Sequence, residues 1–515
     1  MQTEKEYLSE RSLIGLHSES AGEYTLPDYN GDVKRVLVIN PRLSPGGKFI
    51  NESSVEFSGV ISYEVVYLDS ENNIACAKFS TDYEIAVKTD PDVYEDSHVK
   101  TSLCGYNVRL LGPRKFSAKA SLESDVRILE SKSVSIDGDA FEENEPEILR
   151  VGAQVMKSVI AVGNESEHKE ELLALDGAIE DEISVLLCDA SYKMVSVNPD
   201  ESGADIKAEI ALRLLYKNAE DEITLKNVNL PYSARVDSSE LCDCGSLICN
   251  IETTSINTEI LPNESGVTIN CTLCTLPSVR GLRNESLDLV KDAYLKEFGT
   301  INEYRDFDYT EHICTQSEER NISAKIPLTD ICENEICDVI YANSIACVNE
   351  CELVDFGVKV KGEVRFSAIV REENDGEQNY VNARFVVPFE ENVNINCQKH
   401  DNMRVECSAV SLDDKIVSTE NGVLASAALL ITVTLNSNKR QRCLGACSLT
   451  DERYEKEKSV VIAYYPDSSE SIFEIAKRFR TSPLKIAEDN ALSESAFAAK
   501  DAPVSSFGYK KLLIK

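Results

Sequence analysis

The sequence predicts a mainly β protein in which three tandem antiparallel β-sandwich-like repeats precede a small C-terminal βααβ module. Three observations indicate this class. One segment recurs three times along the chain, and in each copy apolar and polar residues alternate with a period of two. A second apolar segment precedes each copy at a constant distance. Beyond residue 458 the alternation gives way to helix-capping signals and a helical apolar stripe.

The recurring segment has the pattern of a half-buried antiparallel strand. Its three copies are 57–67, 206–216 and 360–370. Their alternate positions are apolar, and the positions between them are mostly polar or charged. The third position is small in every copy, as Gly59, Ala208 and Gly362, which indicates that another strand or side chain approaches closely there.

The segments on either side of each copy keep the same register. A shorter apolar segment starts 31 residues before the end of each copy, at Val36, Val185 and Val339. A polar turn and a return strand follow each copy. A shared register of this length indicates three copies of one β unit.

The repeats divide the chain into five predicted parts. These are a first repeat with its lead-in (1–137), a second repeat (165–280), a helical connector (281–322), a third repeat (323–440) and the C-terminal module (458–515). Within the connector, an apolar stripe followed by a glycine predicts a helix over 284–299. The residues concerned are Leu287, Val290, Tyr294, Phe298 and Gly299.

The charge balance argues against two classes of partner. The chain carries 53 Lys and Arg against 89 Asp and Glu, a net charge of −36. Such an excess of acid disfavours nucleic acid and anionic membrane surfaces, which both attract clustered Lys and Arg. The first residues lack the apolar core of a signal peptide, and no apolar stretch approaches the length of a membrane span. We therefore expect a cytoplasmic protein that does not insert into a membrane.

No motif of the sequence predicts catalysis, so we expect no catalytic residues, no cofactor and no metal site. A phosphate-binding glycine loop, a zinc-protease motif and a nucleophile elbow are all missing from the sequence, and the five histidines are scattered. Cys271 and Cys274 lie in a predicted strand, where a spacing of three sends them to opposite faces. The seventeen cysteines are predicted to pack as reduced, small apolar side chains. An enzyme with a novel site in one repeat is the alternative, which would require paired carboxylates or a Cys–His contact in a deep pocket.

The C-terminal module begins and ends with predicted strands that enclose two helices. Ser471 and Glu474 have the spacing of a capping box at the start of the first helix. Ser482 precedes Pro483 at the first position of the second helix, where proline is favoured. Lys477 and Arg478 make the first helix basic, which suits an acidic partner or a solvated helix end.

Residues 469–490 resemble a LysM domain, and three β units followed by one terminal LysM resemble the SPOCS-domain sporulation proteins of clostridia. The lead-in at 24–33 is similar to that of SPOCS units. The resemblance implies a non-enzymatic spore coat adaptor of the mother-cell cytoplasm, located at the forespore surface. Its implied partners are the SpoIVA-like ATPase of the coat basement layer, bound through the LysM domain, and other coat proteins. The implied LysM groove residues are Ser469, Glu470, Ser471, Ile472 and Asn490.

The alternative implied by the same resemblance is a LysM protein that binds peptidoglycan, through N-acetylglucosamine, in the spore cortex or cell wall. Two features of this chain differ from the family at the loops that flank its glycan groove. Ser469 and Glu470 replace Gly-Asp, and an insertion at 498–509 replaces a short loop. These differences, together with the expected cytoplasmic location, favour a protein ligand.

Overall fold

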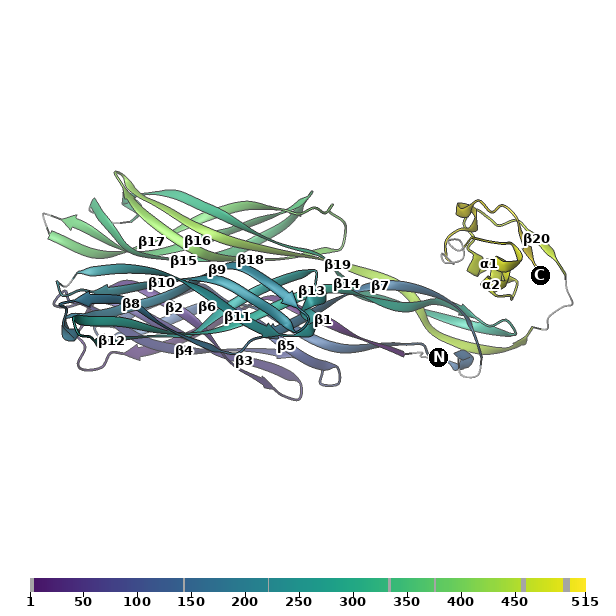
Figure 1. Cartoon of the computed structure of the whole chain (residues 1–515), viewed down its shortest axis with the longest axis horizontal. Coiled ribbons are helices and arrows are strands. Elements are labelled where there is room, and N and C mark those ends of the chain that lie inside the picture. Colours follow the sequence, from purple (N-terminus) through teal and green to yellow (C-terminus); the bar gives the residue numbers. More distant parts are fainter. Residues whose placement is uncertain are drawn as a thin grey trace.

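The computed structural model confirms a mainly β protein, shown in Figure 1. It describes residues 4–141, 144–220, 222–331, 335–374, 377–454, 460–493 and 501–515. Its two α-helices both lie in the C-terminal module. Over the described residues, neither helix has the length and apolar character that crossing a bilayer requires.

The chain up to residue 453 folds as three β-sandwiches of one topology. In each, three consecutive strands form one antiparallel sheet, while the strands before and after them form the other. The first sandwich contains β1 (Glu4–Thr25), β2 (Val33–Ile50), β3 (Ser54–Asp69), β4 (Ile74–Lys88), β5 (Tyr94–Gly112) and β6 (Lys115–Ser135). Its sheets have the strand orders β2-β3-β4 and β1-β6-β5.

The second and third sandwiches repeat this plan. The second contains β7 (Glu147–Val162), β8 (Ser166–Asp176), β9 (Ser184–Asp200), β10 (Gly203–Lys217), β11 (Ile223–Asp237), β12 (Ser246–Pro262) and β13 (Gly266–Tyr294). The third contains β14 (Phe298–Pro327), β15 (Glu335–Val354), β16 (Gly357–Asn374), β17 (Glu377–Asn394), β18 (Met403–Thr419) and β19 (Gly422–Arg453). Among the described strands, the topology of the second sandwich departs from this plan where β7 and β8 together replace a single edge strand, since both pair with β13.

The recurring segments form the central strands β3, β10 and β16, and the constant spacing of 31 residues is the register of strand pairing. The residue that starts each preceding segment lies directly across from the last residue of the recurring one. These pairs are Val36 with Tyr67, Val185 with Tyr216, and Val339 with Val370. The sequence repeat therefore reflects a conserved hairpin geometry within the chain.

The small residues of the recurring strands lie opposite aromatic rings on the return strands. Gly59 pairs with Tyr83, and Gly362 pairs with Phe389. A Cβ atom on either glycine would overlap the ring of its partner. The close approach predicted for this position is therefore that of an aromatic ring, which packs against the glycine backbone.

Substituting Gly59 with alanine is expected to destabilise the first sandwich by about 1–3 kcal/mol, because the buried ring of Tyr83 has to move. Urea unfolding would measure the change. Gly112→Ala is the matched control, since no atom lies within 4 Å of the added Cβ. Equal effects of the two substitutions would contradict the ring contact as the cause.

The three sandwiches pack around one another as a closed ring. β2 of the first contacts β16 and β17 of the third, β15 of the third contacts β11 of the second, and β9 of the second contacts β3 and β4 of the first. Because each sandwich uses the same pair of elements, the ring has pseudo-threefold symmetry. Equivalent apolar residues meet at its centre, namely Leu37, Leu186 and Ile340; Val66, Leu215 and Ile369; and Ile74, Ile223 and Tyr380.

The predicted helix at 284–299 in the connector 281–322 is wrong. This segment is the end of β13, which pairs with β7, and the start of β14, which is an edge strand of the third sandwich. The register of β13 shifts between Val290 and Asp292. Around this bulge β13 is buried on both faces, since Leu287, Val290 and Tyr294 pack in three different apolar clusters. The resulting spacing of apolar residues by three and four imitates that of a helix. The third sandwich accordingly starts at β14, before the predicted limit at 323.

The C-terminal module has the predicted strand–helix–helix–strand order. It consists of β20 (Ile462–Tyr464), α1 (Ile472–Arg478), α2 (Pro483–Asp489) and β21 (Leu512–Ile514). Its core is formed mainly by both helices and β21. In Figure 1 the module lies at one end of the elongated body, above the tips of β13 and β14.

Candidate functional site

The predicted groove residues at the start of α1 serve the fold of the module. Ser471 is the helix N-cap, and its hydroxyl accepts a hydrogen bond from the Glu474 amide in a complete capping box. Ile472 is buried in the core of the module. Glu470 is also buried, and its carboxylate accepts hydrogen bonds from Tyr464 Oη at 2.6 Å and from the Asp467 amide at 3.0 Å.

The charge of Glu470 is compensated inside the module. Arg478 lies 2.5 Å from its Oε1 atom. Burial would raise the pKa of Glu470, but the hydrogen bonds and Arg478 lower it below its usual value. Glu470 therefore remains an ionised structural residue, and Ser469 beside it is exposed.

Asn490 at the end of α2 fastens this helix to β21. Its amide nitrogen donates to the carbonyl of Leu513 at 2.7 Å and to that of Ile486 at 2.9 Å, while its oxygen accepts from the Leu513 amide at 2.6 Å. The side-chain amide is thus fully used by backbone groups.

The described part of the insertion at 498–509 lies against the loop before α1. The Val504 amide donates to the Glu470 carbonyl at 2.9 Å, and Ser471 forms a β-bridge with Pro503. Ser505 Oγ donates to the Ser468 carbonyl at 2.8 Å. Residues 494–500 lie outside the described part of the chain. The two loops that would flank a glycan groove are therefore bonded to each other, and Val504 is buried between them.

The basic face of the module contacts the body of the protein. Lys477 Nζ lies 2.6 Å from Asp292 Oδ2 at the bulge of β13. Arg480 donates to the carbonyl of Leu295 at 3.1 Å, and its guanidinium carbon lies 4.2 Å from the centroid of the Tyr454 ring. Tyr294 Oη donates to the Thr481 carbonyl at 2.6 Å. The positive charges of this face are thus used to hold the module on the acidic body.

The opposite face of the module, formed by β20 and β21, is apolar and exposed. Val461 and Tyr465 expose 57% and 67% of their surface, and Ala463 between them is also exposed. Leu513 lies directly across from Ala463, and Lys511 lies two residues before it on the same face. We name these five residues the outer face of the module. β20 is paired only with β21, so its other edge is free within the described residues.

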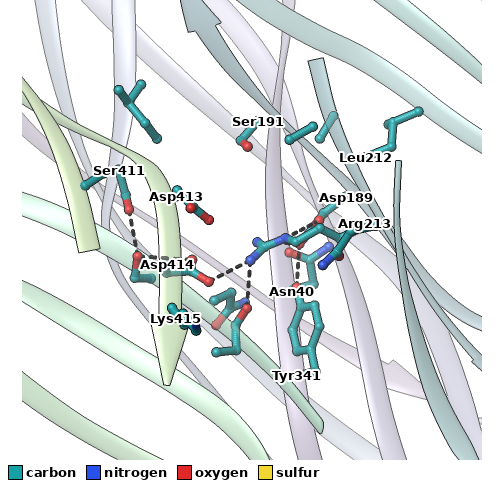
Figure 2. A pocket seen from close by; sticks show the side chains of 18 of the residues that line it. Asn40, Asp189, Ser191, Leu212, Arg213, Tyr341, Ser411, Asp413, Asp414 and Lys415 are labelled. Carbon is teal, nitrogen blue, oxygen red and sulfur yellow. Dashed lines mark hydrogen bonds and ion pairs between the residues drawn. The ribbon is translucent and has the colours of Figure 1, made fainter. Parts of the chain in front are cut away.

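A second candidate site is a cavity of about 880 Å³ at the centre of the ring, which Figure 2 shows from close by. Arg213 of β10 is its principal charged group. Its Nε and Nη2 atoms each donate to Asp189 at 2.9 Å, and Nη1 donates to Asp414 of the third sandwich at 2.6 Å. Tyr341 Oη donates to Asp189 at 2.5 Å.

The electrostatics of this cluster are those of an interdomain clamp. Burial would lower the pKa of Arg213, but Asp189 and Asp414 raise it above its usual value. Burial raises the pKa of Asp414, and Arg213 opposes this effect. Both carboxylates are bound to one guanidinium, which holds the two acids together and offsets one of their two negative charges.

No motif in the sequence identifies this cluster as a site. Arg213 occupies one of the polar positions of the recurring strand, and Glu64 and Ser367 occupy the equivalent positions in the other two copies. The side chains at these positions point out of their own sandwich and toward the other sandwiches of the ring. The sequence does contain one indication that this outer face is covered. Two residues further along each recurring strand, on the same face, the residue is apolar: Val66, Leu215 or Ile369. An exposed strand face would not favour apolar residues there.

The described residues contain no group of three or more His, Cys, Asp or Glu side chains placed to hold a metal ion. Comparisons of the chain with protein-family models, with curated proteins and with solved structures find no match.

Proposed function

We propose that the protein is a non-enzymatic spore coat adaptor, whose C-terminal module is a LysM domain that binds the basement-layer ATPase. The three sandwiches are then SPOCS repeats that help to encase the forespore. The observation that carries this proposal is the outer face of the module, where exposed apolar side chains adjoin Lys511 at one end of the molecule. An exposed aromatic side chain within an apolar patch is typical of protein interfaces.

The arrangement of the module supports a protein ligand over peptidoglycan. Ser471 and Asn490, which the resemblance assigns to a glycan groove, are committed to helix capping and to the α2–β21 contact. The loops beside them are bonded to each other. A sugar would have to break these contacts, whereas a protein strand could add to the free edge of β20 without any rearrangement.

The body of the protein supports a role in assembly. Its three sandwiches share one apolar centre, so the ring can serve as a rigid spacer between the module at one end and other coat proteins. The edge strands of the sandwiches supply further surfaces on which such proteins could pair.

The test is a binding assay between the full-length protein and the purified basement-layer ATPase. Replacing Val461 and Tyr465 with serine is expected to weaken binding at least about tenfold, because both side chains lie on the outer face. Val386→Ser, a matched change on an exposed residue of β17, should leave binding unchanged. Unchanged binding by the double variant would contradict the proposal. Sedimentation with peptidoglycan, lost on Asn490 substitution in a folded variant, would favour the glycan-binding alternative.

A further inference from the structure

Two cysteines that are 243 residues apart in the chain meet between the first and third sandwiches. Cys104 lies on β5 and Cys347 on β15, and these strands contact each other. Cys347 Sγ lies 3.1 Å from the carbonyl oxygen of Cys104. The two thiols also lie close enough for each to shift the pKa of the other. The side chain of one cysteine therefore lies against the backbone of the other across a domain boundary, and such proximity is the first condition for a disulfide.

The surroundings make the two thiols unequal. The interaction with Cys104 lowers the pKa of Cys347, burial opposes this, and the nearby Arg365 guanidinium lowers the pKa further against the smaller opposing effects of Glu363 and Glu123. The interaction with Cys347 raises the pKa of Cys104, as do burial and Glu123, whose carboxylate accepts from its thiol at 3.4 Å. Cys347 is therefore the thiol of the pair that ionises first.

A cavity of about 200 Å³ adjoins the pair and is lined by two arginines. Gly105, next to Cys104, and Ile345, on the same strand face as Cys347, both line it. Arg384 and Arg365 are the charged residues of its lining, and Arg365 is also paired with Glu363 at 2.5 Å. Neither cysteine lines the cavity, but a small anion bound there would lie beside the two strand segments that carry the thiol pair.

Two further thiol pairs serve as a comparison. Cys188 with Cys271, and Cys351 with Cys407, likewise lie close enough for each thiol to shift the pKa of its partner. Each of these pairs lies within a single sandwich, so oxidation there would link no two sandwiches.

We propose that Cys104 and Cys347 form a redox site that joins the first and third sandwiches through a disulfide, with a small anionic disulfide as the oxidant. The Cys347 thiolate attacks the small disulfide, forming a mixed disulfide and releasing one small thiolate. Cys104 then loses its proton and attacks the Cys347 sulfur, which releases the second small thiolate. Two protein thiols are oxidised, and one small disulfide is reduced to two thiols.

The experiment treats the full-length protein with oxidised glutathione, digests it without reduction and identifies linked peptides by mass spectrometry. The expected result is a peptide pair joined through Cys104 and Cys347, and a higher thermal midpoint that returns to its starting value on reduction. Cys347→Ser and Cys104→Ser should each abolish the linked peptide, while their circular dichroism reports whether they fold. Cys242→Ser, at an exposed cysteine, should leave it in place.

The proposal is overturned if Cys104 and Cys347 stay free, or stop at mixed disulfides, under conditions that fully modify Cys242. A linked peptide without any rise in the thermal midpoint would overturn the part of the proposal that concerns joining the sandwiches.

Discussion

Replacing Arg213 with alanine is expected to destabilise the protein by about 3–5 kcal/mol, because two buried carboxylates lose their shared counter-charge. Asp189 and Asp414 come from different sandwiches and both accept hydrogen bonds from this guanidinium. Arg213 also donates to the Ala342 carbonyl at 2.9 Å, which would lose this donor. Urea unfolding at neutral pH measures the loss, and the third sandwich should detach or unfold at a lower denaturant concentration than in the parent protein.

Arg440→Ala is the matched control for this variant. Arg440 also binds an aspartate, Asp308, at 2.6 Å, but both side chains are more than half exposed. An exposed ion pair of this kind contributes about 0–1 kcal/mol, so the control should unfold almost as the parent does. If both variants lost the same small amount, the cluster would not be the clamp inferred from its geometry.

The strand pairing within each sandwich could be predicted from sequence, because it depends on local alternation and on hairpins. The spacing from Val36 to Tyr67 is a direct record of cross-strand register. The small residue at Gly59 likewise indicated the ring that lies across from it. Contacts of this kind involve few residues close in sequence, and they leave a pattern of fixed period.

The ring of three sandwiches could not be predicted in this way. A period of two distinguishes the inside of one sandwich from its outside, but it does not show whether the outside faces solvent or another sandwich. Val66, Leu215 and Ile369 lie on that outer face and are buried at the centre of the ring. The same limitation hid the role of Arg213, which is polar on a strand face that another sandwich covers.

In the C-terminal module, the helix caps could be predicted from the sequence, but the tertiary contacts around them could not. Ser471 caps α1 as its spacing with Glu474 predicted. Its hydroxyl is therefore bonded to the helix. The further contacts that close the loops beside it depend on residues 503–505, which no local pattern connects to Ser471. Lys477 also has the predicted position on α1, but its ion pair with Asp292 depends on a bulge in β13 that no local pattern indicated.

A second buried charge cluster lies where all three sandwiches meet. Glu10 of β1 accepts hydrogen bonds from Arg280 of β13 at 2.7 Å and from Arg127 of β6 at 3.2 Å. Arg127 also donates to Glu406 of β18 at 3.1 Å. Burial would raise the pKa of Glu10, but the two arginines lower it to about 2. The cluster therefore couples the packing of the sandwiches to the ionisation of one carboxylate.

Acidification is expected to destabilise the protein through Glu10 by roughly 3 kcal/mol, since its pKa is about 2 in the folded state against 4.5 as the ordinary value. A carboxylate whose pKa is lowered on folding stabilises the protein above its unfolded pKa. This contribution is lost as the pH falls from about 5 through 2. Urea unfolding measured across this range should show the decline in the free energy of unfolding.

Glu10→Gln separates this effect from that of the other carboxylates. The variant should be less stable than the parent at pH 7, because Arg127 and Arg280 keep only one acidic partner, Glu406. Its stability should also fall less steeply between pH 5 and 2, since the titrating group has gone. Glu84→Gln, at an exposed position of β4, is the control and should keep the pH dependence of the parent. Parallel pH profiles for the parent and the Glu10 variant would show that the junction of the three sandwiches is not the acid-sensitive element.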